Sequence, residues 1–182
     1  MIKKSIKIAI LGPESTGKTV LTQHLSQYFK APWLPELSRS FIENLNRNYT
    51  YSDVETIAHL QITQEDTLQK QHLPLYFLDT ELIITKIWFA QVFKKIPDWF
   101  EQELQVRLAD FYLLCDTSIP WTPDKVRENG GERREFLYRI YKNELNGYKV
   151  PYKVVTNMNQ QRFSNAVNAV SDFISGFKNN PG

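Results

Sequence analysis

The sequence predicts an α/β fold, a three-layer α/β/α sandwich with a parallel five-stranded sheet as its middle layer. Five short apolar runs alternate along the 182 residues with longer segments of helical periodicity. This alternation is typical of a parallel sheet with helices on both faces. The first apolar run also leads directly into a glycine-containing loop and then a helix. Because such sheets bind ligands at the carboxyl ends of their strands, we expect the functional residues to follow the strands.

The expected strands are short and rich in aliphatic and aromatic residues. In chain order they are Ile6–Leu11, Trp33–Leu34, 75–78, 112–115 and 152–156. The second is the weakest, since it has only two apolar residues. Their crossover connections should be right-handed, as nearly all such connections in parallel sheets are.

The expected helices fill the segments between the strands and the segment after the last one. In chain order they span Lys18–Phe29 and residues 53–71, 80–93, 97–108, 132–145 and 160–177. The first carries Leu21, Leu25 and Phe29 at a spacing of four, which places them on one helix face. Ser52 or Asp53 is the expected N-cap of the second helix, because both side chains can accept from a helix's first N–H groups.

The loop after the first strand matches the phosphate-binding pattern G-x-x-x-x-G-K-[ST], the P-loop. Its residues are Gly12, Pro13, Glu14, Ser15, Thr16, Gly17, Lys18 and Thr19. In a P-loop, successive backbone N–H groups and the start of the following helix surround a phosphate. Lys18 would reach the β- and γ-phosphates, and the Thr19 hydroxyl would bind Mg²⁺. A glycine turn without function would not need the strand before it and the helix after it, so the sequence predicts a nucleotide site for ATP and Mg²⁺.

Acidic residues follow the second and third strands. Asp79 ends a buried apolar strand, the arrangement in which P-loop proteins hold Mg²⁺; it is also a good helix N-cap. Glu36 and Arg39 follow the second strand, where a carboxylate can accept the proton of an attacking hydroxyl and an arginine can bind substrate or phosphate. The alternative is a surface ion pair between Glu36 and Arg39 on a helix. Either Glu36 or Asp79 is therefore the candidate base.

Residues 116–131 contain too many prolines and glycines for a regular element. Long irregular connections of this kind are often lids. Arg127 is the first candidate for a catalytic arginine that stabilises the transferred phosphate, and Arg134 is the second. Asp124 would orient Arg127. At the end of the last strand, where an adenine ring usually lies, Asn157 is a further candidate for nucleotide contact.

The overall composition excludes several other classes of protein. A net charge of +2 provides no basic surface for a nucleic acid, and no apolar stretch is long enough for a membrane helix. The one cysteine, Cys115, lies in an apolar run and should be a small buried thiol. We expect one cytoplasmic domain, 1–182, with a lid-like segment at 116–134. The oligomeric state stays open.

Six segments in this order resemble the ribosylnicotinamide kinase domain of the bacterial NadR protein, within the AAA-type ATPase/kinase domains of P-loop NTPases. The segments are GPESTGKT at 12–19, ELSR at 36–39, YSD at 51–53, FLDTE at 77–81, WTPDKVR at 121–127 and YKVPY at 148–152. The resemblance covers nearly the whole chain. It implies transfer of the γ-phosphate of ATP to the 5′-hydroxyl of nicotinamide riboside, which gives nicotinamide mononucleotide.

The resemblance also implies roles for particular residues. Those implied in catalysis are Lys18, Glu36, Asp79, Arg127 and Arg134. Those implied in substrate contact are Glu36, Arg39, Tyr51, Asp79 and Glu81. The metal ligands would be Thr19 and Asp79.

The chain departs from that family pattern at a few positions, which keeps other functions open. It has Pro35 where the family member carries a tryptophan, Glu81 where it carries an aspartate, and PDKVR at 123–127 where the family has D-D-G-x-R. One alternative is a kinase for another nucleoside or a small alcohol. An alternative of a different class is a regulatory P-loop ATPase without a small-molecule acceptor.

Overall fold

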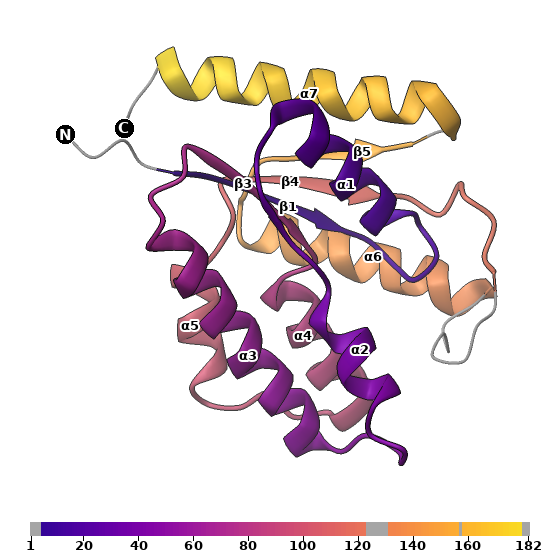
Figure 1. The fold of residues 1–182 in the computed structure, drawn as a ribbon. Coiled ribbons are helices and arrows are strands. Elements are labelled where there is room, and N and C mark those ends of the chain that lie inside the picture. Colours follow the sequence, from indigo (N-terminus) through magenta and orange to yellow (C-terminus); the bar gives the residue numbers. More distant parts are fainter. Residues whose placement is uncertain (1–4, 123–130, 157, 180–182) are drawn as a thin grey trace.

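A computed structural model of the chain describes residues 5–122, 131–156 and 158–179. Its centre is a five-stranded sheet in the order β2-β3-β1-β4-β5, and every neighbouring pair is parallel. The strands are β1 (Ile6–Leu11), β2 (Trp33–Leu34), β3 (Leu75–Asp79), β4 (Phe111–Cys115) and β5 (Tyr152–Val155). The predicted fold class is confirmed, and all five strands lie where the apolar runs place them (Figure 1).

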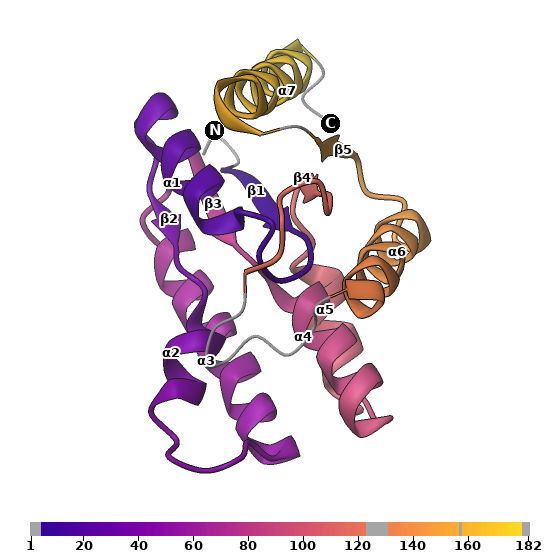
Figure 2. The same cartoon turned by 90° about the vertical axis from the view of Figure 1, so that its right-hand side faces the viewer.

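Helices cover both faces of this sheet (Figure 2). They are α1 (Lys18–Phe29), α2 (Leu37–Glu43), α3 (Tyr51–Gln69), α4 (Leu82–Trp88), the π-helical turn η1 (Phe89–Phe93), α5 (Phe100–Val106), α6 (Gly131–Gly147) and α7 (Asn159–Asn179). Alternate residues of β1 face opposite sides, as the strand period requires. Ile8 and Ile10 pack in the core beneath α1 and α7, whereas Ala9 and Leu11 pack in the core formed with α3, α4 and α6.

Three helices differ from the sequence-based expectation. The short helix α2 was not predicted; none of its residues is buried, so it carries no clear apolar face for a sequence pattern to reveal. The helix expected over 80–93 starts at Leu82, because Thr80 has a positive φ of 73° and Glu81 is the extended N-cap. It then gives way to the π-helical turn η1. The helix expected over 97–108 is confined to α5, three residues beyond Pro97.

The start of α3 corrects the expected cap. The N-cap is Thr50 rather than Ser52 or Asp53, and Asp53 is the third helical residue. Asp53 accepts from the Thr50 backbone N–H at 2.7 Å, and the Thr50 hydroxyl accepts from the Asp53 N–H at 3.4 Å, which is a capping box. Arg47 donates twice to the same carboxylate and, with Thr50, keeps the pKa of Asp53 well below its usual value.

The expectation of a buried thiol is confirmed. Cys115 is fully buried, and burial raises the pKa of its thiol to about 11. None of the helices in the described ranges combines the length and the apolarity that crossing a bilayer requires.

Candidate active site

The phosphate-binding loop joins β1 to α1 at the carboxyl edge of the sheet. Gly12 has φ +144°, and a Cβ at this position would lie 2.6 Å from the carbonyl oxygen of Cys115 in β4. Gly17 has φ +71° and is the N-cap of α1, with no side chain to occupy the first N–H groups of the helix. Both glycines are therefore required by the backbone path. The open start of α1 leaves its N–H groups available to an anion.

The inner side of the loop is ordered by its own side chains. The Thr16 hydroxyl donates to the carbonyl oxygen of Pro13 at 2.8 Å, and the Lys18 ammonium donates to the same oxygen at 3.0 Å. Thr16 is fully buried. Lys18 thus lies folded across the loop, in position to exchange the Pro13 oxygen for a phosphate oxygen.

Thr19 and Asp79 are brought together across sixty positions of sequence. The Thr19 hydroxyl donates to Asp79 Oδ2 at 2.6 Å, and the other carboxylate oxygen, Oδ1, is buried with no hydrogen-bond partner in the described part of the chain. Burial raises the pKa of Asp79 to about 6; the charge of nearby Glu36 adds to this effect, while the Thr19 bond and the charge of Lys18 oppose it. This arrangement places the two predicted metal ligands side by side.

The pair fits a magnesium ion. Hydroxyl and carboxylate oxygens are ligands that Mg²⁺ prefers, usually together with water and substrate phosphates. The unpaired Asp79 Oδ1 is an oxygen that such an ion would satisfy. No group of three or more His, Cys, Asp or Glu side chains suited to a metal occurs within 5–122, 131–156 and 158–179. The nucleotide and water would therefore complete the coordination.

Glu36 lies just before α2, and Arg39 lies within α2; both follow the end of β2. Glu36 is the N-cap of α2, half-buried, and its Oε1 accepts from the Ser38 hydroxyl at 2.6 Å. Arg39 is exposed and donates to Glu43 one turn further on, at 3.2 Å. Because β2 and β3 are parallel, Glu36 lies at the same edge of the sheet as Asp79, and its charge contributes to the raised pKa of Asp79.

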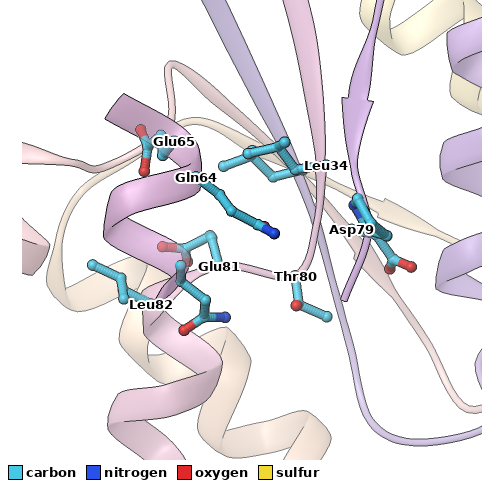
Figure 3. Close-up of a pocket in the computed structure, with 10 residues that line it drawn as sticks. Leu34, Gln64, Glu65, Asp79, Thr80, Glu81 and Leu82 are labelled. Carbon is cyan, nitrogen blue, oxygen red and sulfur yellow. The ribbon is translucent and has the colours of Figure 1, made fainter. Parts of the chain in front are cut away.

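A pocket lies between the ends of β2 and β3 and the middle of α3; we call it the β2–β3 pocket. It is lined by Leu34, Pro35, Gln61, Gln64, Glu65, Leu78, Asp79, Thr80, Glu81 and Leu82. Figure 3 shows the amide of Gln64 reaching into the space between Thr80 and Glu81. The enclosed space is about 20 Å³, enough for a water molecule. A larger ligand would enter it by displacing side chains such as Gln64.

Glu81 is the N-cap of α4 and lies at the bottom of this pocket. Its Oε1 accepts from the Ile83 N–H at 3.0 Å, while Oε2 is buried without a partner among the described residues. Burial raises the pKa of Glu81 to about 8, only partly offset by the backbone bonds to its carboxyl group. A protonated Glu81 can both donate and accept, which suits a neutral polar group.

Tyr51 lies further from the P-loop, at the start of α3. Its ring packs against Phe89 at 5.1 Å and Phe93 at 5.5 Å between ring centres. It is not among the residues that line the β2–β3 pocket. The ammonium of Lys95 lies 5.5 Å from the centre of the Tyr51 ring.

Arg134 binds the P-loop from outside. Although it lies in the first turns of α6, it is 5% exposed. Its guanidinium donates to the carbonyl oxygens of Glu14 at 3.0 Å, Ser15 at 2.9 Å and Thr117 at 3.3 Å. Ser15 has a positive φ of 58°, and these bonds help to hold that strained residue in place.

Three other expected residues, Arg127, Asp124 and Asn157, lie outside the described residues. Arg133, the neighbour of Arg134, is exposed, with its guanidinium 5.2 Å from the centre of the Phe136 ring.

Sequence reasoning missed Arg162, which lies in no recognised motif. It is 3% exposed in the first turns of α7, and its Nη2 donates to the carbonyl oxygen of Thr16 at 2.6 Å. The only sequence signal is an arginine close to the start of the last helix, which by itself indicates nothing.

The loop, the Thr19–Asp79 pair and the sheet order define a P-loop domain of the kinase type. The chain belongs to the AAA domain family, whose model matches residues 7–162. It is 26% identical over 135 residues to the trifunctional NAD biosynthesis/regulator protein NadR of Escherichia coli, an alignment that covers 71% of this chain. The chain spans about a third of the length of that relative, 33%.

Solved structures show the same fold. A crystal structure of the NadR protein in complex with NR matches with a TM-score of 0.71 and 20% identity, over 93% of this chain and 49% of the other. The structure of deoxyadenosine kinase from M. mycoides with products dCMP and dCDP matches with a TM-score of 0.65 and 15% identity, over 92% of this chain and 100% of the other. At these identities the structural likeness concerns the fold.

Proposed function

We propose that this chain is an ATP-dependent kinase that transfers the γ-phosphate to the 5′-hydroxyl of nicotinamide riboside, giving nicotinamide mononucleotide. The observation that carries the proposal is the Thr19–Asp79 pair, which joins the phosphate-binding loop to the acid-lined β2–β3 pocket. A kinase needs this adjacency, because the two substrates must meet in line at the γ-phosphate. The similarity to NadR supports the choice of acceptor.

In this mechanism the chain's own residues mainly position the reactants and balance charge. The P-loop N–H groups and Lys18 bind the β- and γ-phosphates. Thr19 and Asp79 would hold Mg²⁺, which neutralises charge on the phosphate oxygens when bound. Because Asp79 would hold the metal, we assign the acceptor proton to Glu36, which lies at the same edge of the sheet and accepts from Ser38 through one oxygen.

The charge of the β2–β3 pocket favours an acceptor that is neutral or cationic. Its acidic lining residues are Glu65, Asp79 and Glu81, and none of the lining residues is a lysine or arginine. An acceptor that already carries a phosphate would find no lysine or arginine in the lining to bind that phosphate, and Lys7, which lies close by, is already paired with Glu65; this is unfavourable. A neutral or cationic acceptor is not penalised in this way. The nicotinamide ring of nicotinamide riboside is cationic, so the pocket suits it better than a nucleoside monophosphate.

A phosphotransfer assay tests the proposal. The purified chain is incubated with ATP, Mg²⁺ and, in turn, nicotinamide riboside, adenosine, deoxyadenosine, cytidine and thymidine monophosphate. ADP formation and product mass are measured. We expect the highest kcat/KM with nicotinamide riboside, and loss of turnover in Lys18→Met.

The other outcomes identify the rival functions. A higher kcat/KM with another nucleoside would overturn nicotinamide riboside as the acceptor and leave a nucleoside kinase. ADP formation that needs no acceptor would instead support a regulatory ATPase.

A further inference from the structure

We infer that Arg162 of α7 is a positioning residue for the phosphate-binding loop, holding the Thr16–Gly17 peptide so that its N–H faces the nucleotide. The inference deepens the proposed function, since it rests on nucleotide binding by this loop. It concerns a residue outside the P-loop and outside the segments that follow β2 and β3.

The first argument is the pattern of bonds around the loop. Three consecutive carbonyl oxygens of the loop each accept from an arginine outside it. They are those of Glu14 and Ser15, both from Arg134, and of Thr16, from Arg162. In a planar trans peptide the C=O and the next N–H point in opposite directions. Donors that hold the carbonyls outward therefore direct the following N–H groups inward.

The second argument is the position of the Arg162 guanidinium. Besides the 2.6 Å bond to Thr16, its Nη1 lies 3.4 Å from the carbonyl oxygen of Val155, the last residue of β5. Nη2 would lie 4.0 Å from a Cβ at Gly17. One rigid planar group thus joins the loop, the end of β5 and α7, which a flexible ammonium on a lysine would do less well.

The third argument is electrostatic. Arg162 is 3% exposed, and no ion pair joins it to a carboxylate in the part of the chain that the structure describes. A buried cation that meets only carbonyl oxygens is incompletely compensated. The phosphates of a nucleotide in the loop would bring the missing negative charge nearby. Arg162 should therefore favour the nucleotide-bound protein over the ligand-free one.

The test compares Arg162→Met, Arg162→Lys and the matched control Arg139→Met. Arg139 is an exposed arginine of α6. For each variant, calorimetry gives the Kd of ATP–Mg²⁺, steady-state kinetics give KM for ATP and for the acceptor, and urea unfolding gives the stability of the ligand-free protein. We expect Arg162→Met to raise the Kd and KM for ATP at least tenfold while the acceptor KM changes less than twofold. Arg162→Lys should be intermediate, and Arg139→Met unchanged.

Two results would overturn the inference. One is a Kd for ATP–Mg²⁺ within twofold of wild type in Arg162→Met or, if that variant does not fold, in Arg162→Lys. The other is an equal rise of the KM for ATP and the KM for the acceptor, which would mean a general disturbance of the site rather than an effect on the phosphate-binding loop. Calorimetry needs no acceptor, so weakened ATP binding in Arg162→Met would uphold the inference even if nicotinamide riboside were not phosphorylated.

Discussion

At the residue scale, Asp79 and Glu81 show how two nearby carboxyl groups acquire different properties. Each has one oxygen bonded and one buried without a partner in the described part of the chain. Asp79 faces Thr19 of the P-loop, whereas Glu81 faces the β2–β3 pocket from the start of α4. Buried polar atoms without partners are rare because they are energetically costly. Those that do occur are often found where a ligand binds.

Asp79→Asn is expected to weaken metal-dependent nucleotide binding. An amide removes the negative charge that Mg²⁺ would meet, while the hydrogen bond with Thr19 can persist. The affinity for ATP in the presence of Mg²⁺ should fall at least about tenfold, whereas the affinity in EDTA should stay within about twofold. Calorimetry under both conditions measures this. Equal losses with and without the metal would argue against Asp79 as a ligand.

Glu81→Gln is expected to make stability less dependent on pH. In the folded protein the pKa of Glu81 is about 8, well above the value of about 4.3 for an unfolded glutamate. Below that lower value the group is protonated in both states and costs nothing. As pH rises from about 4.5 to 8 the unfolded chain loses the proton first, so folding becomes less favourable. The glutamine variant lacks this penalty.

Urea unfolding in EDTA at pH 5 and pH 8 measures the effect. The stability of Glu81→Gln relative to wild type should increase between the two pH values, by a few kcal/mol at most (about 1.4 kcal/mol per pKa unit). Glu135→Gln, at an exposed position of α6, is the control and should show no such change. A difference between Glu81→Gln and wild type that is flat with pH would contradict the raised pKa.

Gly12 and Asp79 could be recognised from sequence, because their roles depend on neighbours in the chain. The pattern around Gly12 needs only a strand before it and a helix after it, and Asp79 needs only to end a buried strand. Arg162 could not be recognised, because its partner Thr16 lies 146 positions away. The expected cap of α3 was wrong for a related reason: several capping residue types, Thr50, Ser52 and Asp53, stand within four positions, and only the backbone path selects Thr50.

At the scale of elements, the helices around the P-loop contribute different parts of the site. α1 provides the open N-terminus, while α6 and α7 approach the loop from outside through Arg134 and Arg162. On the other side, α3 and α4 build the β2–β3 pocket. The short helix α2 carries Glu36 at its start, has no fully buried residue and packs against α3.

Thr50→Ala should destabilise the protein without affecting nucleotide affinity. The capping box that Thr50 forms with Asp53 fixes the first turn of α3, and removal of such a cap costs about 1 kcal/mol. Urea unfolding measures the loss, and the Kd of ATP–Mg²⁺ should be unchanged. Ser52→Ala, at an exposed position in the same turn, is the matched control. A larger loss in Ser52→Ala than in Thr50→Ala would restore Ser52 as the cap.

At the scale of the whole molecule, the sheet order separates the two proposed substrates. β1 lies between β3 and β4, so the P-loop stands at the middle of the carboxyl edge. Glu36, Asp79 and the β2–β3 pocket lie on one side, and Arg162 with the end of β5 lies on the other. This division agrees with an acceptor on the β2–β3 side and a nucleotide that extends toward β5.

Cys115 provides a probe of the whole fold. Its thiol is fully buried and has a pKa of about 11, so it should react with a disulfide reagent only when the protein opens. Saturating ATP–Mg²⁺ should slow this reaction by the factor by which it stabilises the folded state. The rate of thiol labelling with and without nucleotide measures this, and urea-unfolded protein is the control. Rapid labelling of the folded protein would mean that the region around β4 opens locally.

The anchoring of the loop by Arg162 also bears on synthesis by the ribosome. The P-loop leaves the ribosome early. The strands β3 and β4, which flank β1, and the residues Arg134 and Arg162, which bind the P-loop, are translated much later. At about 5–20 residues per second, the delay between Thr19 and Arg162 is roughly 7 to 30 seconds. A nascent polypeptide that ends before α7 would contain the P-loop sequence without Arg162, so ATP should bind it more weakly and stabilise it less than it stabilises the full chain.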